Sequence, residues 1–164
     1  IAEVTAADGV RTDIEPLTGL LTREGFEEMV ATLLGARNRD DDRYLVMAVV
    51  AIDSFAPLQS LQGSRATDRA RVAVGQGVRE TVRRDTFTVP DPTPLAERIR
   101  GAVASTPQGI TASVGVVCTP LRPLADRPPL DVVEEVIALA TAAMCRARAR
   151  GGNQAEYLID KEGL

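Results

Sequence analysis

Apolar residues recur at helical spacing in four segments of the chain. The hydroxyl of Thr22 can cap the first segment, which ends in the polar turn 38–42. The other three span residues 65–84, residues 93–103 after a Thr93-Pro94 start, and residues 131–150 after a capping box of Asp131 and Glu134. These patterns predict four helices.

Three other segments have the patterns of strands. Residues 44–52 are nearly all apolar and often β-branched, which predicts a central strand covered on both faces. Residues 109–118 alternate in the manner of a strand, and residues 154–159 form a last one. A short turn is expected after residue 52. The order of elements predicts an α+β fold, with helices packed on a central, mostly antiparallel sheet.

The length and composition of the chain indicate one ordinary globular domain. It has 164 residues, of which 45% are hydrophobic and 26% charged. We expect the domain to span 13–164 and residues 1–12 to be a linker or the end of an upstream helix. No apolar run approaches the roughly 18 residues of a membrane span, so we expect a cytoplasmic domain without membrane contact. The chain begins without Met, from which we expect a piece of a larger protein, either soluble or membrane-bound.

Charge and residue usage exclude several classes of function. The net charge of −4 gives no reason to expect nucleic-acid binding. The chain has no histidine, which excludes His-based zinc sites and Ser-His-Asp triads. Cys118 and Cys145 are interpreted as two buried thiols rather than a disulfide. An enzymatic role would therefore need carboxylates, a metal or a bound nucleotide.

Several short motifs together resemble the GGDEF domain of diguanylate cyclases. They are Glu-Pro-Leu-Thr-Gly-Leu at 15–20, Ala-Ile-Asp-Ser-Phe at 51–55, Thr-Ala-Ser-Val-Gly-Val at 111–116, and the helix and Gly-Gly-Asn end at 140–153. The resemblance covers residues 13–159. It implies the ferredoxin-like topology of the nucleotidyl-cyclase palm, and a family that joins two GTP molecules into cyclic di-GMP.

The resemblance also argues against catalysis by this chain. In the family the strand ends in Asp-x-Asp-x-Phe-Lys, and its first Asp holds the catalytic metal. That position is Ala51 here, whose methyl group cannot coordinate Mg²⁺. Asp53 remains as a weak metal candidate, although we favour a structural or capping role for it. Mg²⁺ is expected only if a nucleotide binds.

The resemblance implies four candidates for nucleotide binding: Phe55, Gln59, Asp68 and Arg148. Gln59 and Asp68 align with the Asn and Asp that read the guanine edge in the family. Arg148 aligns with a phosphate-holding Lys, while the family's other two cations are Ala56 and Gly152 here. The alternative for Asp68 is that its negative charge only stabilises the first turn of its helix. The alternative for Arg148 is that its side chain is simply solvated at the end of its helix.

The family's hairpin, with Gly-Gly-Asp/Glu-Glu-Phe at its tip, has no room between the helices ending near Arg84 and starting at Pro94. Either the protein lacks it, or the protein has it and the sequence omits it. We favour omission of the hairpin from the sequence, because a protein without the hairpin would have a sheet edge with unpaired backbone groups. The residues between the two helices suffice for one short strand at 86–89. The omission hypothesis predicts a backbone break between Asp85 and Val89.

These observations predict a catalytically impaired GGDEF-like signalling domain of a larger regulatory protein. It would act as a dimerisation or interaction module, as a homodimer or with other domains of its chain, or as a sensor of GTP or cyclic di-GMP. One alternative is an active or weakly active diguanylate cyclase. The other is a purely structural protein-interaction domain.

Overall fold

The computed structural model describes residues 13–36, 42–84, 91–106 and 109–160, without the side chains of 81–84. Its elements are α1 (Arg23–Gly35), β1 (Tyr44–Ile52), α2 (Phe55–Gln62), α3 (Ser64–Arg84), α4 (Thr93–Ala104), β2 (Ala112–Pro120), the 3₁₀ turn η1 (Arg122–Leu124), α5 (Pro129–Ala149) and β3 (Ala155–Ile159). The expected linker 1–12, the short strand at 86–89 and the backbone break lie outside the described residues.

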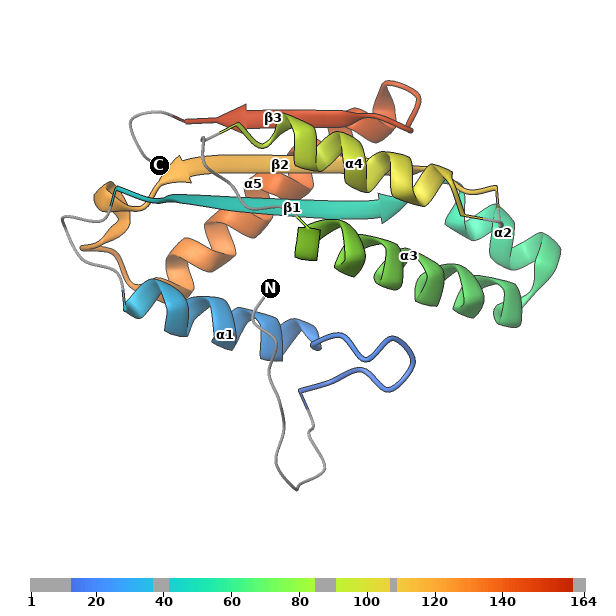
Figure 1. Ribbon diagram of the computed structural model, residues 1–164, viewed down its shortest axis with the longest axis horizontal. Helices are drawn as coiled ribbons and strands as arrows, with labels where there is room; N and C mark the ends of the chain where they lie inside the picture. The colour runs from blue at the N-terminus through green and yellow to red at the C-terminus, as the bar shows by residue number, and fades with distance from the viewer. Residues whose placement is uncertain (1–12, 37–41, 85–90, 107–108, 161–164) are drawn as a thin grey trace.

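The described strands form one sheet in the order β1-β2-β3 (Figure 1). β1 pairs antiparallel with β2 in an unbroken register, from Tyr44 opposite Pro120 to Ile52 opposite Ala112. β3 pairs with β2 in parallel. The α+β prediction is confirmed, with the longer of the two ladders antiparallel.

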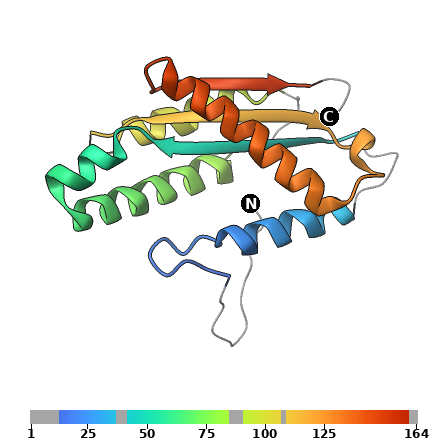
Figure 2. The ribbon, with the colours of Figure 1, turned by 180° about the vertical axis from the view of Figure 1, so that it is seen from behind.

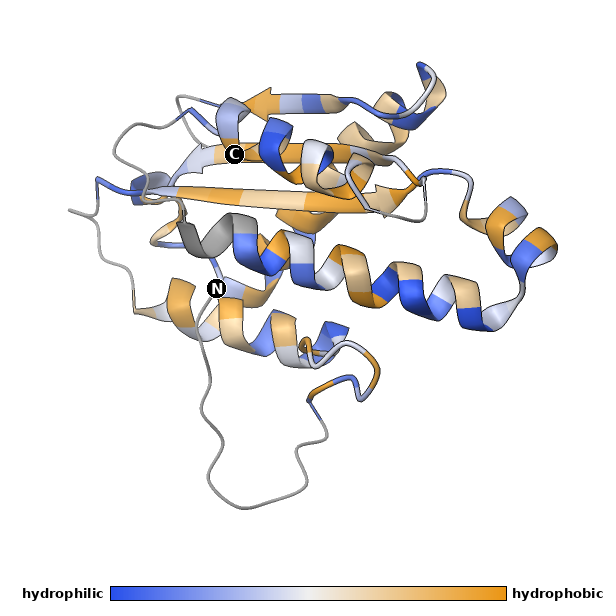
Figure 3. Ribbon diagram, turned by 45° about the vertical axis from the view of Figure 1, so that its right-hand side comes forward, coloured by the Kyte–Doolittle hydropathy of each residue, from blue (hydrophilic) through white to orange (hydrophobic). Residues whose placement is uncertain are grey.

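Helices cover both faces of this sheet. α3 and α4 lie on one face, while α5 crosses the other face with α1 beside it (Figures 1 and 2). β1 and β2 are correspondingly apolar along most of their length, as their largely orange ribbon shows (Figure 3). Clusters of buried side chains fill both interfaces, one centred on Ile99 with Val114 and Val116, the other on Val117 with Val133 and Val136. No helix in the described ranges is long and apolar enough to cross a membrane.

The centre of the sheet is β2, whose first eight residues are all buried. Gly115 explains how closely α5 packs on it. A Cβ at this position would stand 2.0 Å from the Ala140 carbonyl oxygen and 2.2 Å from the Met144 nitrogen. Only glycine lets the helix backbone approach the strand this closely.

The expectation that residues 44–52 form a central strand is wrong for the described sheet, although helices do cover both of its faces. β1 lies at its edge, and Met47 is the only residue of β1 that is buried. An all-apolar run indicates burial on both faces but says nothing about how many neighbours a strand has. The edge position therefore depends on pairing that the run itself does not encode.

Several helix boundaries also differ from the prediction. The stretch after residue 52 is not a short turn, because α2 follows it with Leu58 buried. Thr93 is the first residue of α4 rather than its cap, and its N–H donates to the Asp91 carboxylate at 3.0 Å. α5 begins at Pro129, so Asp131 lies in its first turn without a capping bond. The Thr22 cap is confirmed, since its hydroxyl accepts the Gly25 N–H at 3.2 Å.

The two cysteines differ in environment. Both are free thiols; Cys118 is buried in β2, whereas Cys145 is exposed on α5. The expectation of two buried thiols is therefore wrong for Cys145. The helical pattern of the segment does not reveal that this residue lies on the side of α5 turned away from the sheet.

Candidate functional site

The end of β1 carries a carboxylate that joins three segments of the chain. The Asp53 Oδ1 accepts a hydrogen bond from the Ser113 hydroxyl at 2.7 Å. Its Oδ2 accepts one from the Thr111 hydroxyl and one from the Asn153 N–H, both at 2.8 Å. The Asp53 N–H donates to the Thr111 carbonyl at 2.9 Å. Asp53 therefore ties the end of β1 to the start of β2 and to the turn before β3.

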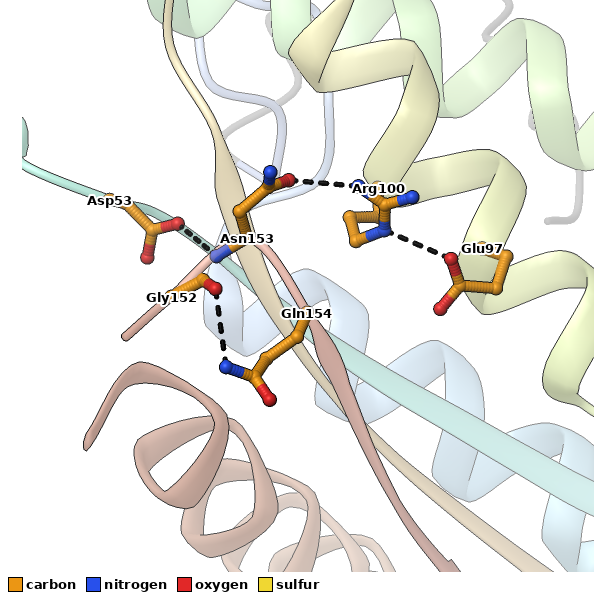
Figure 4. Close-up of polar contacts among 6 residues, drawn as sticks. All are labelled: Asp53, Glu97, Arg100, Gly152, Asn153 and Gln154. Atoms are coloured by element: carbon orange, nitrogen blue, oxygen red, sulfur yellow. Dashed lines mark hydrogen bonds and ion pairs between the residues drawn. The ribbon is translucent and has the colours of Figure 1, made fainter. Parts of the chain in front are cut away.

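The turn between α5 and β3 is shaped to meet this carboxylate (Figure 4). Gly152 has φ +73°, and a Cβ there would stand 2.8 Å from the Asp53 Cγ. Asn153 also has a left-handed backbone, with φ 50°, which asparagine tolerates better than most residues. Glycine at 152 thus lets the turn pack directly on Asp53.

A chain of polar contacts extends from this point across to α4. The Asn153 side-chain oxygen accepts a hydrogen bond from Arg100 at 2.9 Å, and Arg100 is also paired with Glu97 at 2.9 Å (Figure 4). The Gln154 amide donates to the Gly152 carbonyl at 3.3 Å. The network therefore links α4 and the turn before β3 to the end of β1.

The environment of Asp53 favours its charged form. Partial burial by itself raises the pKa of the carboxyl. The hydrogen bonds from Ser113, the Asn153 N–H and Thr111, together with the nearby positive charge of Arg148, outweigh that effect and hold the pKa below its ordinary value. Asp53 is thus an ionised carboxylate whose two oxygens already receive three hydrogen bonds.

This arrangement does not fit a Mg²⁺ ion. Ala51, which the resemblance aligns with the family's metal ligand, pairs with Ser113 across the ladder and offers no oxygen beyond its backbone. Mg²⁺ is usually bound through one or two carboxylates, and both oxygens of Asp53 are engaged. Among the residues that the structure describes, no group of three carboxylate or thiol side chains is placed to hold a metal.

Arg148 reaches the same end of the sheet from α5. Its guanidinium donates a long hydrogen bond of 3.5 Å to the Ile52 carbonyl, next to Asp53. The side chain is otherwise exposed. Arg148 thus lies beside the end of β1, where it can satisfy a backbone group and still meet an anion from solvent.

The other nucleotide candidates lie on α2 and α3. Phe55 begins α2, and the Arg71 guanidinium carbon lies 5.0 Å from the centre of its ring, a cation–π distance. Gln59 is exposed on α2, while Asp68 is half-buried on α3. The candidates therefore form two groups, Asp53 with Arg148 at the strand end and Phe55, Gln59 and Asp68 on the α2–α3 pair.

Sequence reasoning did not find the partners of Asp53. Thr111, Ser113, Gly152 and Asn153 all lie in motifs that carry the resemblance, yet their convergence on one carboxylate was not expected. Arg100 and Glu97 gave no signal beyond an ordinary i,i+3 charged pair on a helix. The features of the sequence that could have indicated this site are two hydroxyl residues, two adjacent glycines and Asp53.

Comparison with known proteins finds solved structures of similar fold. No family model and no curated protein matches the sequence. Among solved structures, a diguanylate cyclase from Pseudomonas aeruginosa, SiaD in complex with its activator SiaC, is similar with a TM-score of 0.72 at 21% identity. That match covers 90% of this chain and 62% of the cyclase, so this chain spans less than two thirds of it.

A second similar structure is the GGDEF domain of DgcB from Caulobacter crescentus in complex with c-di-GMP. Its TM-score is 0.71 at 18% identity, and the match covers 92% of this chain and 98% of that one. The coiled coil and GGDEF domain of the same protein gives 0.70 at 20%, covering 89% and 85% of the two chains. At these identities the similarity concerns the fold. The chain has the fold of the GGDEF domains of diguanylate cyclases.

Proposed function

We propose that this chain is a catalytically impaired GGDEF-like domain that acts as a cytoplasmic signalling module of a larger regulatory protein. The proposal rests on the residues at the end of β1 and on the hydrogen bonds that they make. Ala51 stands at the family's metal position, and the oxygens of Asp53 are taken up by Ser113, Thr111 and Asn153. A cyclase aligns two triphosphates with metal ions, and the described strand end does not provide the ligands.

The domain would act through binding. Arg148 is exposed beside Asp53, and Phe55, Gln59 and Asp68 lie on the neighbouring α2–α3 pair. These side chains supply an aromatic ring, an amide, a carboxylate and a guanidinium, the groups that recognise a guanine base and a phosphate. They support a role as a sensor of GTP or cyclic di-GMP. Association of two copies, or with other domains of its chain, is the second way such a module would transmit a signal.

Calorimetric titration of the purified domain with GTP plus Mg²⁺, and separately with cyclic di-GMP, tests the proposal. We expect micromolar binding of one of them and no conversion of GTP to cyclic di-GMP. Asp68→Ala should weaken binding, with exposed Asp131→Ala, on α5, as a matched control. For Arg148→Ala the matched control is Arg146→Ala, because Arg146 is exposed on the same helix.

Each outcome separates the candidate functions. Formation of cyclic di-GMP by the unaltered domain would defeat the proposal and establish an active cyclase. Absence of binding to either nucleotide, with a folded domain, would exclude the sensor role and leave the interaction module. Loss of binding in the two control variants as well would mean that the α2–α3 pair and Arg148 are not the site.

A further inference from the structure

The aromatic ring at the start of α2 has a charged neighbour from α3. The Arg71 guanidinium carbon lies 5.0 Å from the centre of the Phe55 ring. Phe55 is half-buried and belongs to none of the described clusters of buried core residues, so its ring is not simply part of the core. The ring attracts the charge and fixes the side chain of Arg71. A guanidinium has five N–H donors, which leaves donors for a further acceptor.

Asp68 and Gln59 lie on the same side of this helix pair. α2 and α3 pack against each other next to the end of β1 (Figure 1). Residues three or four positions apart are neighbours on a helix surface, so Asp68 lies beside Arg71 on α3 and Gln59 lies on the face of α2 that carries the aromatic ring. Because Arg71 reaches the Phe55 ring, the face of α3 that carries Asp68 is turned toward α2.

Asp68 and Arg71 do not pair with each other. At this spacing on a helix, an Asp and an Arg commonly form an ion pair. Among the residues that the structure describes, neither side chain has an ion pair or a hydrogen bond, and the guanidinium lies over Phe55 instead. The half-buried carboxylate and the exposed guanidinium are therefore both available to a ligand.

This pair of side chains offers two acceptors beside several donors. Guanine presents the complementary order along its edge, with the 2-amino group and N1–H as donors, followed by O6 and N7 as acceptors. A carboxylate accepts from the first two groups, and a guanidinium donates bidentately to the other two. Adenine has an unprotonated N1 and a 6-amino group at the middle positions. It would place an acceptor against the carboxylate and a donor against the guanidinium.

We propose that Arg71 is a specificity-determining residue of the nucleotide site, where it donates to O6 and N7 of guanine beside Asp68. Phe55 acts through Arg71, as a positioning residue that holds the guanidinium over its ring. The inference rests on the function proposed above, which uses Asp68 and Phe55 but gives no role to Arg71. It assigns the recognition of the O6 and N7 side of the base to this arginine.

Nucleotide analogues test the two contacts with the base separately. 7-Deaza-GTP has a C–H group in place of N7, and ITP lacks the 2-amino group. Each analogue therefore removes one hydrogen bond, to Arg71 or to Asp68. In calorimetric titrations with Mg²⁺, we expect the parent domain to bind GTP about fivefold or more tighter than it binds either analogue.

Variants of the two side chains should remove one preference each. Arg71→Met keeps an unbranched side chain over the Phe55 ring but has no N–H donors. It should bind GTP and 7-deaza-GTP equally and still prefer GTP to ITP. Asp68→Ala should show the opposite pattern. Arg69→Met removes the same charge from an exposed position of α3, so this control should keep both preferences.

The positioning role of Phe55 has its own readout. Phe55→Leu removes the ring that holds the guanidinium, so the preference for GTP over 7-deaza-GTP should fall while the preference over ITP remains. Phe55→Tyr keeps a ring and should keep both preferences. Circular dichroism confirms that each variant is folded. A purely structural role of Phe55 would instead weaken the binding of all three nucleotides by the same factor, which would overturn its positioning role.

The outcomes separate this inference from the proposed function. Equal binding of GTP and 7-deaza-GTP by the parent domain, or a preference that survives in Arg71→Met, would overturn the role of Arg71 and leave the sensor of GTP in place. Absence of GTP binding by the folded parent domain would overturn this inference together with the GTP-sensing role. Cyclic di-GMP would then be the remaining nucleotide candidate.

Discussion

The Asp53 carboxylate accepts the Ser113 hydroxyl at 2.7 Å, across the ladder between β1 and β2. Ser113 is fully buried, so this bond satisfies a hydroxyl that has no access to water. The carboxylate is therefore part of the structural core at the strand end.

Asp53→Asn should destabilise the domain by about 1–3 kcal/mol. An amide cannot accept all three hydrogen bonds, and its NH₂ group would face a group that now donates to the carboxylate. Urea unfolding followed by circular dichroism measures this. Asp131→Asn, at an exposed position on α5, serves as the control and should change stability by less than about 0.5 kcal/mol. Equal stability of both variants would show that the Asp53 contacts are dispensable.

Stability should fall with acidity in a way that depends on Asp53. Its pKa is lower in the folded state than the ordinary value of about 3.9 expected when unfolded. The stabilisation is therefore complete above the unfolded pKa and is lost as pH falls through the folded one. Unfolding curves between about pH 5 and pH 2 should show this decline. Asp53→Asn should make it shallower but not abolish it, since hydrogen bonds from Thr93 also lower the pKa of Asp91.

Gly115→Ala should cost about 3 kcal/mol or more, because the new methyl group would overlap the backbone of α5 at Ala140 and Met144. Gly101→Ala is the matched control. No atom lies within 4 Å of a Cβ there, so alanine should stabilise α4 by about 0.5–1 kcal/mol. Thermal unfolding of both variants checks the opposite signs. A tolerated alanine at 115 would mean that α5 does not rest on β2 as described.

Gly152→Ala should destabilise more than Gly19→Ala. Both glycines have a positive φ, +73° and +67°, so both alanines carry backbone strain of about 1 kcal/mol. Only the one at 152 also meets the Asp53 carboxylate. The difference between the two variants in urea unfolding therefore isolates the packing of the turn on Asp53. No difference would show that the turn can move away at little cost.

Ala51→Asp should yield no cyclic di-GMP from GTP and Mg²⁺. The variant restores one carboxylate, but Asp53 stays engaged and the family's other cation positions remain Ala56 and Gly152. Chromatographic detection of product, with an active diguanylate cyclase as positive control, measures this. Product above the background of the unaltered domain would show that the single carboxylate was the missing component.

The sequence by itself determined the α+β class and the order of α1, α3, α4 and α5 with the three described strands. These features depend on the spacing of apolar residues and on residue chemistry, so residues close together in the sequence suffice to predict them. The Thr22 cap belongs to the same class, since its hydroxyl and the Gly25 N–H are three residues apart. Helix α2 escaped prediction because its eight residues bury a single side chain, Leu58.

The tertiary structure alone decided the environment of Asp53 and the position of β1. The partners of Asp53 lie 58, 60 and 100 residues further along the chain, a separation that no local pattern spans. β1 has the composition of an interior strand, yet it lies at the edge of the described sheet, because pairing depends on which strands the fold brings beside it. Residue type states what a side chain is able to do, and long-range packing decides which of these contacts it makes.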